Sequence, residues 1–101
     1  MNDIIGIAWF NDGPIYRRAL AVFIDSKNMP ASFEDWKDFV KRECEEIKRT
    51  GNIALRVDTD PETFVDWCNV HGFRADSQGR TAFVNHVELE YQKTGKGTII
   101  E

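Results

Sequence analysis

The feature that most constrains the fold is a strand-then-helix pattern that occurs twice. Apolar runs at residues 4–10 and 53–58 each end in an acidic turn that carries a proline, and an amphipathic stretch follows each turn. The first run is apolar on both faces, which is typical of a strand covered on both sides, and we expect it to be central in the sheet. Long helical stretches separate the two runs, so a tight hairpin is excluded and parallel pairing is predicted.

Four amphipathic helices are predicted, and the sequence marks where each begins and ends. Polar N-cap residues accept hydrogen bonds from the first turn of a helix, and glycine commonly follows the last turn. The predicted starts are the turn at residues 11–14, Ser32, Asp60 with Pro61, and either Asp76 or Ser77. The predicted ends are near Ile24, at Gly51, at Gly72 and within residues 93–97.

The order of elements is therefore β-α-α-β-α-α, which defines a small α+β domain. Its sheet has two strands, which we expect to be parallel, and about four helices pack against it. Residues 98–101 are expected either to fray or to add a third strand at the edge of the sheet. The length of 101 residues is that of one ordinary domain, so we treat residues 1–101 as a single domain.

Charge and composition exclude several classes of protein. Nucleic-acid binders gather Lys and Arg on one face, whereas this chain has a formal net charge of -4, so we expect neither a nucleic acid nor an anionic membrane as partner. No apolar stretch approaches the roughly 20 residues that span a bilayer, and the start lacks the charged region of a signal peptide. Cys44 and Cys68 lie in predicted helices as buried thiols do, which favours the reducing cytoplasm.

The densest cluster of reactive groups follows the second strand, where Asp58, Asp60, Glu62 and Asp66 place four carboxylates within nine residues. Ligands of α/β proteins bind at strand ends, and clustered carboxylates suit Mg²⁺ or Ca²⁺. The alternative is that Asp60 and Glu62 stabilise the start of a helix while the other two are solvated. The spacing lacks the glycine and distal glutamate of a calcium loop, so we favour the structural interpretation and expect no metal or cofactor.

Arg80 lies at the predicted start of the fourth helix, where a cation opposes the helix dipole and needs an anionic partner. We expect Asp76 or Asp58 to be that partner. The functional alternative is that the planar guanidinium recognises an anionic ligand.

Cys68 and His71 lie three residues apart on one predicted helical face, with Cys44 and His86 elsewhere in the chain. A zinc site needs four ligands and no Cys-x-x-Cys pair is present, so we interpret Cys68 as a core residue and His71 as a rim residue. A nucleophilic Cys-His pair is the alternative. The tryptophans, Trp9, Trp36 and Trp67, are expected in the core, and an exposed one would indicate an interface.

Several segments together resemble a family of short uncharacterised bacterial proteins. They are Ile-Ala-Trp-Phe at 7–10, Trp36, Val-Asp-Thr-Asp at 57–60, Phe-Val-Asp-Trp-Cys at 64–68, then Gly72, Asp76 and Arg-Thr-Ala-Phe at 80–83. The resemblance covers nearly the whole chain. It implies a free-standing cytoplasmic domain from a bacterium and carries no known activity or catalytic residue.

The common enzyme signatures, such as a Ser-His-Asp set or a glycine-rich phosphate loop, are absent from the sequence. We therefore expect a noncatalytic protein-interaction domain or a homo-oligomer, because large aromatic residues are abundant and residues 98–101 can extend a sheet edge. The alternative is a small-ligand or metal-binding enzyme that uses Asp58 and Asp60 with Arg80. With Trp67, these three are the candidate binding residues.

Overall fold

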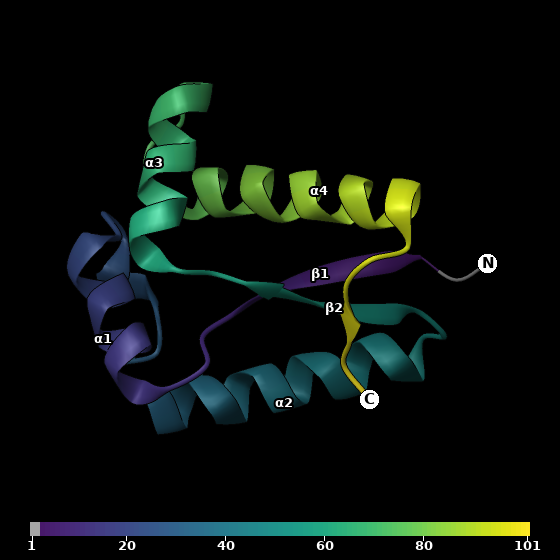
Figure 1. Cartoon of the computed structure of the whole chain (residues 1–101). Coiled ribbons are helices and arrows are strands. Elements are labelled where there is room, and N and C mark those ends of the chain that lie inside the picture. The colour runs from purple at the N-terminus through teal and green to yellow at the C-terminus, as the bar shows by residue number, and fades with distance from the viewer. Residues whose placement is uncertain (1–2) are drawn as a thin grey trace.

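The computed structural model describes residues 3–101 (Figure 1). The predicted α+β class and element order are confirmed, and the C-terminal residues do form a third strand. The elements are β1 (Ile4–Trp9), α1 (Gly13–Val22), the 3-10 turn η1 (Ser26–Asn28), α2 (Phe33–Arg49), β2 (Ile53–Asp58), α3 (Pro61–His71), α4 (Ser77–Thr94) and β3 (Thr98–Ile99).

The sheet has the strand order β1-β2-β3. Strands β1 and β2 pair in parallel, as predicted, whereas β3 pairs antiparallel to β2. The expectation that β1 is central is wrong, because the C-terminal segment adds to β2 through a bond from the Ile100 N–H to the Ala54 carbonyl at 2.9 Å. At β1, the Gly6 N–H instead donates to Glu88 Oε1 of α4 at 3.0 Å.

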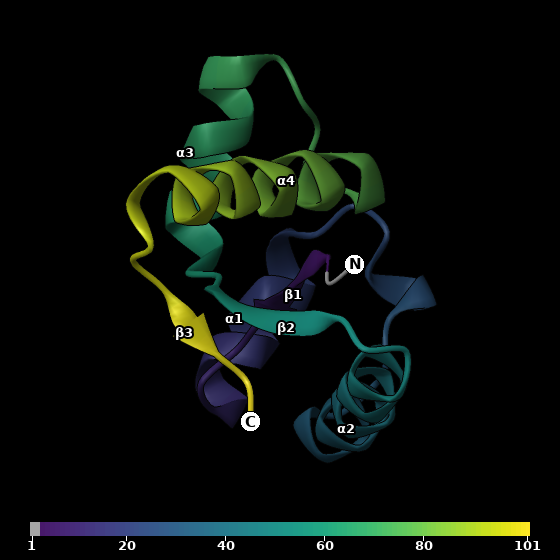
Figure 2. The ribbon, with the colours of Figure 1, turned by 90° about the vertical axis from the view of Figure 1, so that its right-hand side faces the viewer.

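Helices cover both faces of the sheet and one end of it. Figures 1 and 2 show α4 on one face, α2 on the opposite face, and α1 with α3 at the carboxyl ends of β1 and β2. The α4 layer is close to β1: a Cβ on Gly6 would lie 2.5 Å from Val84 Cγ1. Within residues 3–101, no helix has the length and apolar character needed to cross a membrane.

The core is built mainly from aromatic rings. Phe10 of the β1–α1 connection contacts Tyr16 and Trp36, with ring centroids 5.3 and 5.2 Å away, and Phe23 meets Phe64 at 5.4 Å. Such edge-to-face pairs add to the stabilisation from buried area. The Tyr16 hydroxyl donates to the Pro30 carbonyl, and burial raises the pKa of this phenol.

Most of the predicted helix boundaries are confirmed. Ser32, Asp60 and Asp76 accept bonds from first-turn N–H groups, and Gly72 adopts the left-handed conformation after α3. Helix α1 ends at Val22, two residues before the predicted end. The reason is that Phe23 leaves the helix in an extended conformation and turns into the core, where only 3% of it is exposed.

Candidate functional site

The predicted carboxylate cluster is held by local structural contacts. Asp58 accepts a bond from Arg56 Nε at 2.6 Å. Asp60 accepts the Thr63 N–H at 3.0 Å as the N-cap of α3 and lies 3.4 Å from the Arg18 guanidinium. The bonds from Thr63 lower the pKa of the Asp60 carboxyl. Residues 3–101 bring no three His, Cys, Asp or Glu side chains together in a way that could hold a metal ion.

Arg80 does not pair with Asp76 or Asp58, so that prediction is wrong. Its two terminal nitrogens donate to both carboxylate oxygens of Asp25 at 2.8 and 2.7 Å, and its guanidinium lies 4.8 Å from the centre of the Phe23 ring. The Asp76 carboxylate is occupied by N–H groups at the start of α4, and Asp58 is occupied by Arg56. The hydrogen bond from Arg80 lowers the pKa of Asp25.

Trp67 lies half-buried between α3 and α4. Its ring stacks on His71 with centroids 4.2 Å apart, and its buried Nε1–H has no partner within residues 3–101.

The placements of a core cysteine and a rim histidine are confirmed, because Cys68 is buried and His71 is exposed. Burial raises the pKa of the Cys68 thiol, which disfavours a nucleophilic thiolate.

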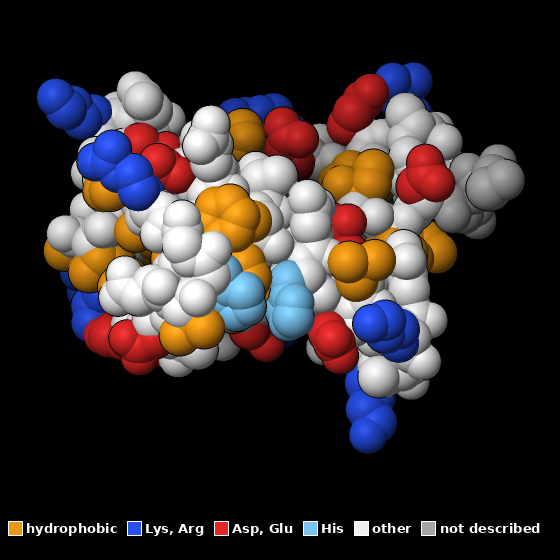
Figure 3. All heavy atoms as spheres, turned by 90° about the horizontal axis from the view of Figure 1, so that it is seen from above, with side chains coloured by type: hydrophobic (Ala, Val, Ile, Leu, Met, Phe, Trp, Pro, Cys, Tyr) orange, Lys and Arg blue, Asp and Glu red, His pale blue; other side chains and the backbone are white. Residues whose placement is uncertain are grey.

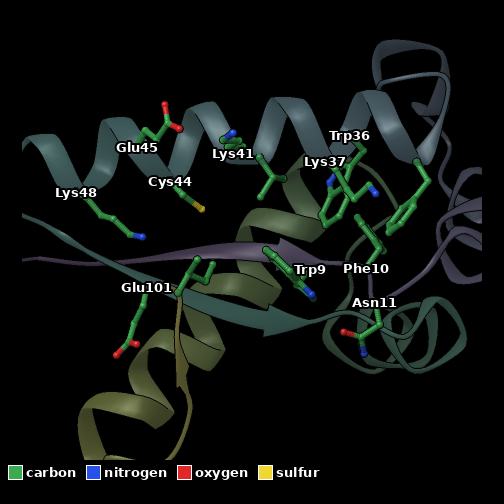
Figure 4. A pocket seen from close by; sticks show the side chains of 13 residues that line it. Trp9, Phe10, Asn11, Trp36, Lys37, Lys41, Cys44, Glu45, Lys48 and Glu101 are labelled. Carbon is green, nitrogen blue, oxygen red and sulfur yellow. The ribbon is translucent and has the colours of Figure 1, made fainter.

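A hollow with aromatic walls and charged edges lies elsewhere, between α2 and the sheet. We call it the α2 cleft (Figure 4). Its volume is about 580 Å³, within the range of ligand sites in proteins. It is lined by Trp9, Phe10, Asn11, Phe33, Trp36, Lys37, Val40, Lys41, Cys44, Glu45, Lys48, Ile100 and Glu101.

One end of the α2 cleft is an aromatic box. Trp9 meets Trp36 edge-on with centroids 5.5 Å apart, and Phe33 stacks on Trp36 at 5.5 Å. The Arg56 guanidinium lies 5.5 Å from the centre of the Trp9 ring and donates to Asn11 Oδ1 at 2.7 Å. This bond leaves the Asn11 amide NH₂, which has no partner within the described residues, as a hydrogen-bond donor at the cleft.

A row of lysines on α2 forms the upper edge of the cleft in Figure 4. Lys37, Lys41 and Lys48 follow the helical repeat, so all three lie beside the buried stripe of the helix. Lys37 and Lys41 flank the aromatic box, and Lys37 Nζ lies 5.1 Å from the centre of the Phe33 ring. The two lining carboxylates, Glu45 and Glu101, lie at the other end with Lys48, so the aromatic end is positively charged.

The spacing of the lysines in the sequence could have indicated the basic edge of this cleft, but the alternating charges of α2 favoured another interpretation. Lys37, Lys41 and Lys48 each directly follow a buried position of α2, at 36, 40 and 47. A helical wheel therefore predicts a basic edge, but alternating charges along α2 favour the simpler interpretation of a solvated face. The opposite wall cannot be found in this way, because it depends on where β3 pairs.

The structure thus separates the residues that the sequence grouped together. Asp58 and Asp60 share a small hollow of about 180 Å³ with Trp9, and Arg80 is bound by Asp25. The enzyme alternative stays a prediction. No family model, curated protein or solved structure matches the chain, and the resemblance to short bacterial proteins also stays a prediction.

Proposed function

We propose that this protein is a noncatalytic interaction domain that binds an acidic, extended segment of a partner protein in the α2 cleft. An apolar or aromatic side chain of the partner packs against the box formed by Trp9, Phe33 and Trp36, and its neighbouring carboxylates meet Lys37 and Lys41. The proposal rests on one observation: the aromatic box and two lysines lie next to each other at one end of a cleft of about 580 Å³.

The length of the cleft favours a peptide over a small molecule. Its lining on α2 extends from Phe33 to Lys48, which corresponds to about 22 Å of helix at about 1.5 Å per residue. An extended peptide rises about 3.3 Å per residue, so six or seven residues match this length. A single planar ligand would occupy only the aromatic end and would leave the rest of the cleft empty.

The positive charge of the lysines that line the cleft favours a partner with an acidic segment. The chain as a whole has a net charge of -4 and therefore repels acidic partners at long range. Three lysines on one helix edge reverse the sign locally, and flat aromatic side chains are the usual anchors of protein interfaces. The proposed partner therefore has an acidic segment with one aromatic anchor.

We also place the protein in the cytoplasm and propose neither a nucleic-acid nor a membrane partner. Both cysteines are free and buried, which suits a reducing compartment. The basic groups form a short row on α2 with carboxylates beside them, and this is not the extended basic face that a phosphate backbone requires.

Peptide display followed by fluorescence anisotropy tests the proposal. Peptides selected on the wild-type protein are expected to share an aromatic residue flanked by Asp or Glu. The double variant Lys37→Glu/Lys41→Glu is expected to weaken their binding by about tenfold or more, because like charges then face each other across the interface.

The matched control is Lys27→Glu/Lys96→Glu, which changes the net charge equally at exposed lysines outside the cleft lining. It is expected to keep nearly full affinity. Equal losses in both double variants would show that only the overall charge matters and would contradict the proposal. Selection of basic peptides, or of none, would contradict it as well.

A further inference from the structure

The fold brings the two histidines of the chain together on a surface away from the α2 cleft. His71 is the last residue of α3 and His86 lies on α4, and their ring centroids are 6.3 Å apart. Both side chains are exposed, and Figure 3 shows the two imidazoles side by side on the surface. Trp67 lies against both rings, with its centroid 4.2 Å from that of His71 and 5.7 Å from that of His86.

The hydrogen bond of His71 determines its tautomer. Its Nδ1 lies 2.8 Å from the Trp67 carbonyl oxygen. A carbonyl only accepts hydrogen bonds, so Nδ1 carries the proton and Nε2 keeps a free lone pair in the neutral ring. Histidines that bind metal ions typically donate their other ring N–H to a backbone carbonyl or carboxylate in this way.

We propose that His71 and His86 form a binding site for a divalent transition-metal ion, of which Zn²⁺ is the simplest probe. Two imidazoles bound to one zinc ion at about 2.0–2.1 Å have ring centroids about 5 Å apart in tetrahedral geometry. The observed separation is 6.3 Å, so a closure of about 1 Å by two exposed side chains is sufficient. The stacked Trp67 ring limits the motion of His71 and so reduces the entropy cost of binding.

Water completes the coordination of the ion. No cluster of three or more His, Cys, Asp or Glu ligands exists within residues 3–101, and the nearby thiol of Cys68 is buried, with 1% of the residue exposed. A site with two protein ligands leaves open positions, so the bound ion remains exchangeable and accessible to a further ligand. The net charge of -4 favours the approach of a cation.

The test is a zinc titration of protein from which any polyhistidine tag has been removed, followed by calorimetry and by NMR of the imidazole nitrogens. One ion per chain is expected to bind, with shifts at Nε2 of His71 and in the ring of His86. Before zinc is added, the Nδ1 of His71 is expected to be protonated. His71→Gln and His86→Gln each remove a metal ligand and are each expected to weaken zinc binding by more than about tenfold, the lower end of the loss that follows removal of an outer-shell hydrogen bond.

A relocated histidine provides the matched control. Asn85→His in the His86→Gln background keeps the same number of imidazoles but turns one of them by about 100° around α4. It is not expected to restore binding. The proposal is overturned if the relocated histidine restores binding, if either single variant binds zinc as the wild type does, or if a millimolar excess of zinc leaves both imidazoles unshifted.

Discussion

At the level of single residues, the ion pair between Arg80 and Asp25 is only partly predictable from the sequence. That a cation at the start of α4 needs an anion follows from the helix dipole alone. The identity of the anion cannot be predicted from the helix dipole, because Asp25 reaches Arg80 only after the end of α1 packs against the residues before α4. A bond from the Ile24 N–H to the Ala75 carbonyl at 2.8 Å marks that packing.

Asp25→Asn is expected to destabilise the fold by about 1.5–3 kcal/mol at pH 7, the range for hydrogen bonds to charged groups. The pKa of Asp25 is lowered in the folded state, chiefly by the bond from Arg80. Its stabilisation is therefore present above the unfolded pKa of about 3.9 and is lost as the pH falls through the folded pKa. Urea unfolding from pH 7 to pH 3 measures the effect.

The difference in unfolding free energy between wild type and Asp25→Asn should shrink below about pH 4. Asp66→Asn is the matched control, because Asp66 is exposed and makes no hydrogen bond within residues 3–101. It is expected to change little at any pH. A difference for Asp25→Asn that stays constant with pH would contradict the assignment of the charge pair.

Gly79→Ala is expected to destabilise the protein by about 1–3 kcal/mol, as overpacking in a core does. A Cβ at Gly79 would overlap the Arg74 carbonyl oxygen and lie 3.1 Å from Cys68 Sγ, and a backbone atom cannot move aside easily. Gly13→Ala is the control, because the nearest atom to its Cβ would be the flexible end of Arg17 at 3.2 Å, and Phe33 Cβ would lie at an ordinary contact distance of 4.0 Å. Similar melting temperatures for the two variants would contradict this packing.

At the scale of elements, the features that depend on a few neighbouring residues were predictable. Ser32, Asp60 and Gly72 mark helix boundaries through local hydrogen bonds and backbone conformation, and all three do so in the structure. The position of β1 at the edge of the sheet was not predictable in this way. It depends on whether residues 98–101 pair with β1 or β2, and such a long-range choice leaves no periodic signal.

Asp60→Ala is expected to destabilise the protein by about 0.5–2 kcal/mol, the usual cost of removing an N-cap. Asp58→Ala removes only an ion pair with Arg56 in which the aspartate is exposed, and should cost less than about 1 kcal/mol. Neither change is expected to affect binding of the acidic peptide. Chemical unfolding checks the stabilities, and loss of peptide binding in both variants would contradict the placement of the binding site in the α2 cleft.

Deletion of residues 98–101 is expected to destabilise the protein and to cause self-association. The deletion removes the partly buried Ile100, for which we expect a loss of about 1–2 kcal/mol, given about 1.5–3 kcal/mol for a fully buried isoleucine. It also uncovers the second edge of β2, which can then pair with another chain. Light scattering and urea unfolding measure the two effects, and a monomer of unchanged stability would contradict the role given to β3.

At the scale of the whole molecule, the two proposed sites lie on different parts of the fold, and each has its own tryptophans. Trp9 and Trp36 line the α2 cleft, whereas Trp67 stacks between α3 and α4 beside the histidines. The sequence predicted three aromatic residues in a core. It did not indicate that two of them also line a cleft, because the cleft forms only when α2 packs against the sheet.

Peptide binding in the α2 cleft is tested most directly by an NMR titration of the three indole N–H signals with a selected acidic peptide. Binding in the α2 cleft is expected to shift the signals of Trp9 and Trp36 and to leave that of Trp67 in place. Zinc provides the internal comparison, because the metal site is expected to shift Trp67 alone. A peptide that shifts the Trp67 signal while the signals of Trp9 and Trp36 stay unchanged would show that the peptide does not bind in the α2 cleft.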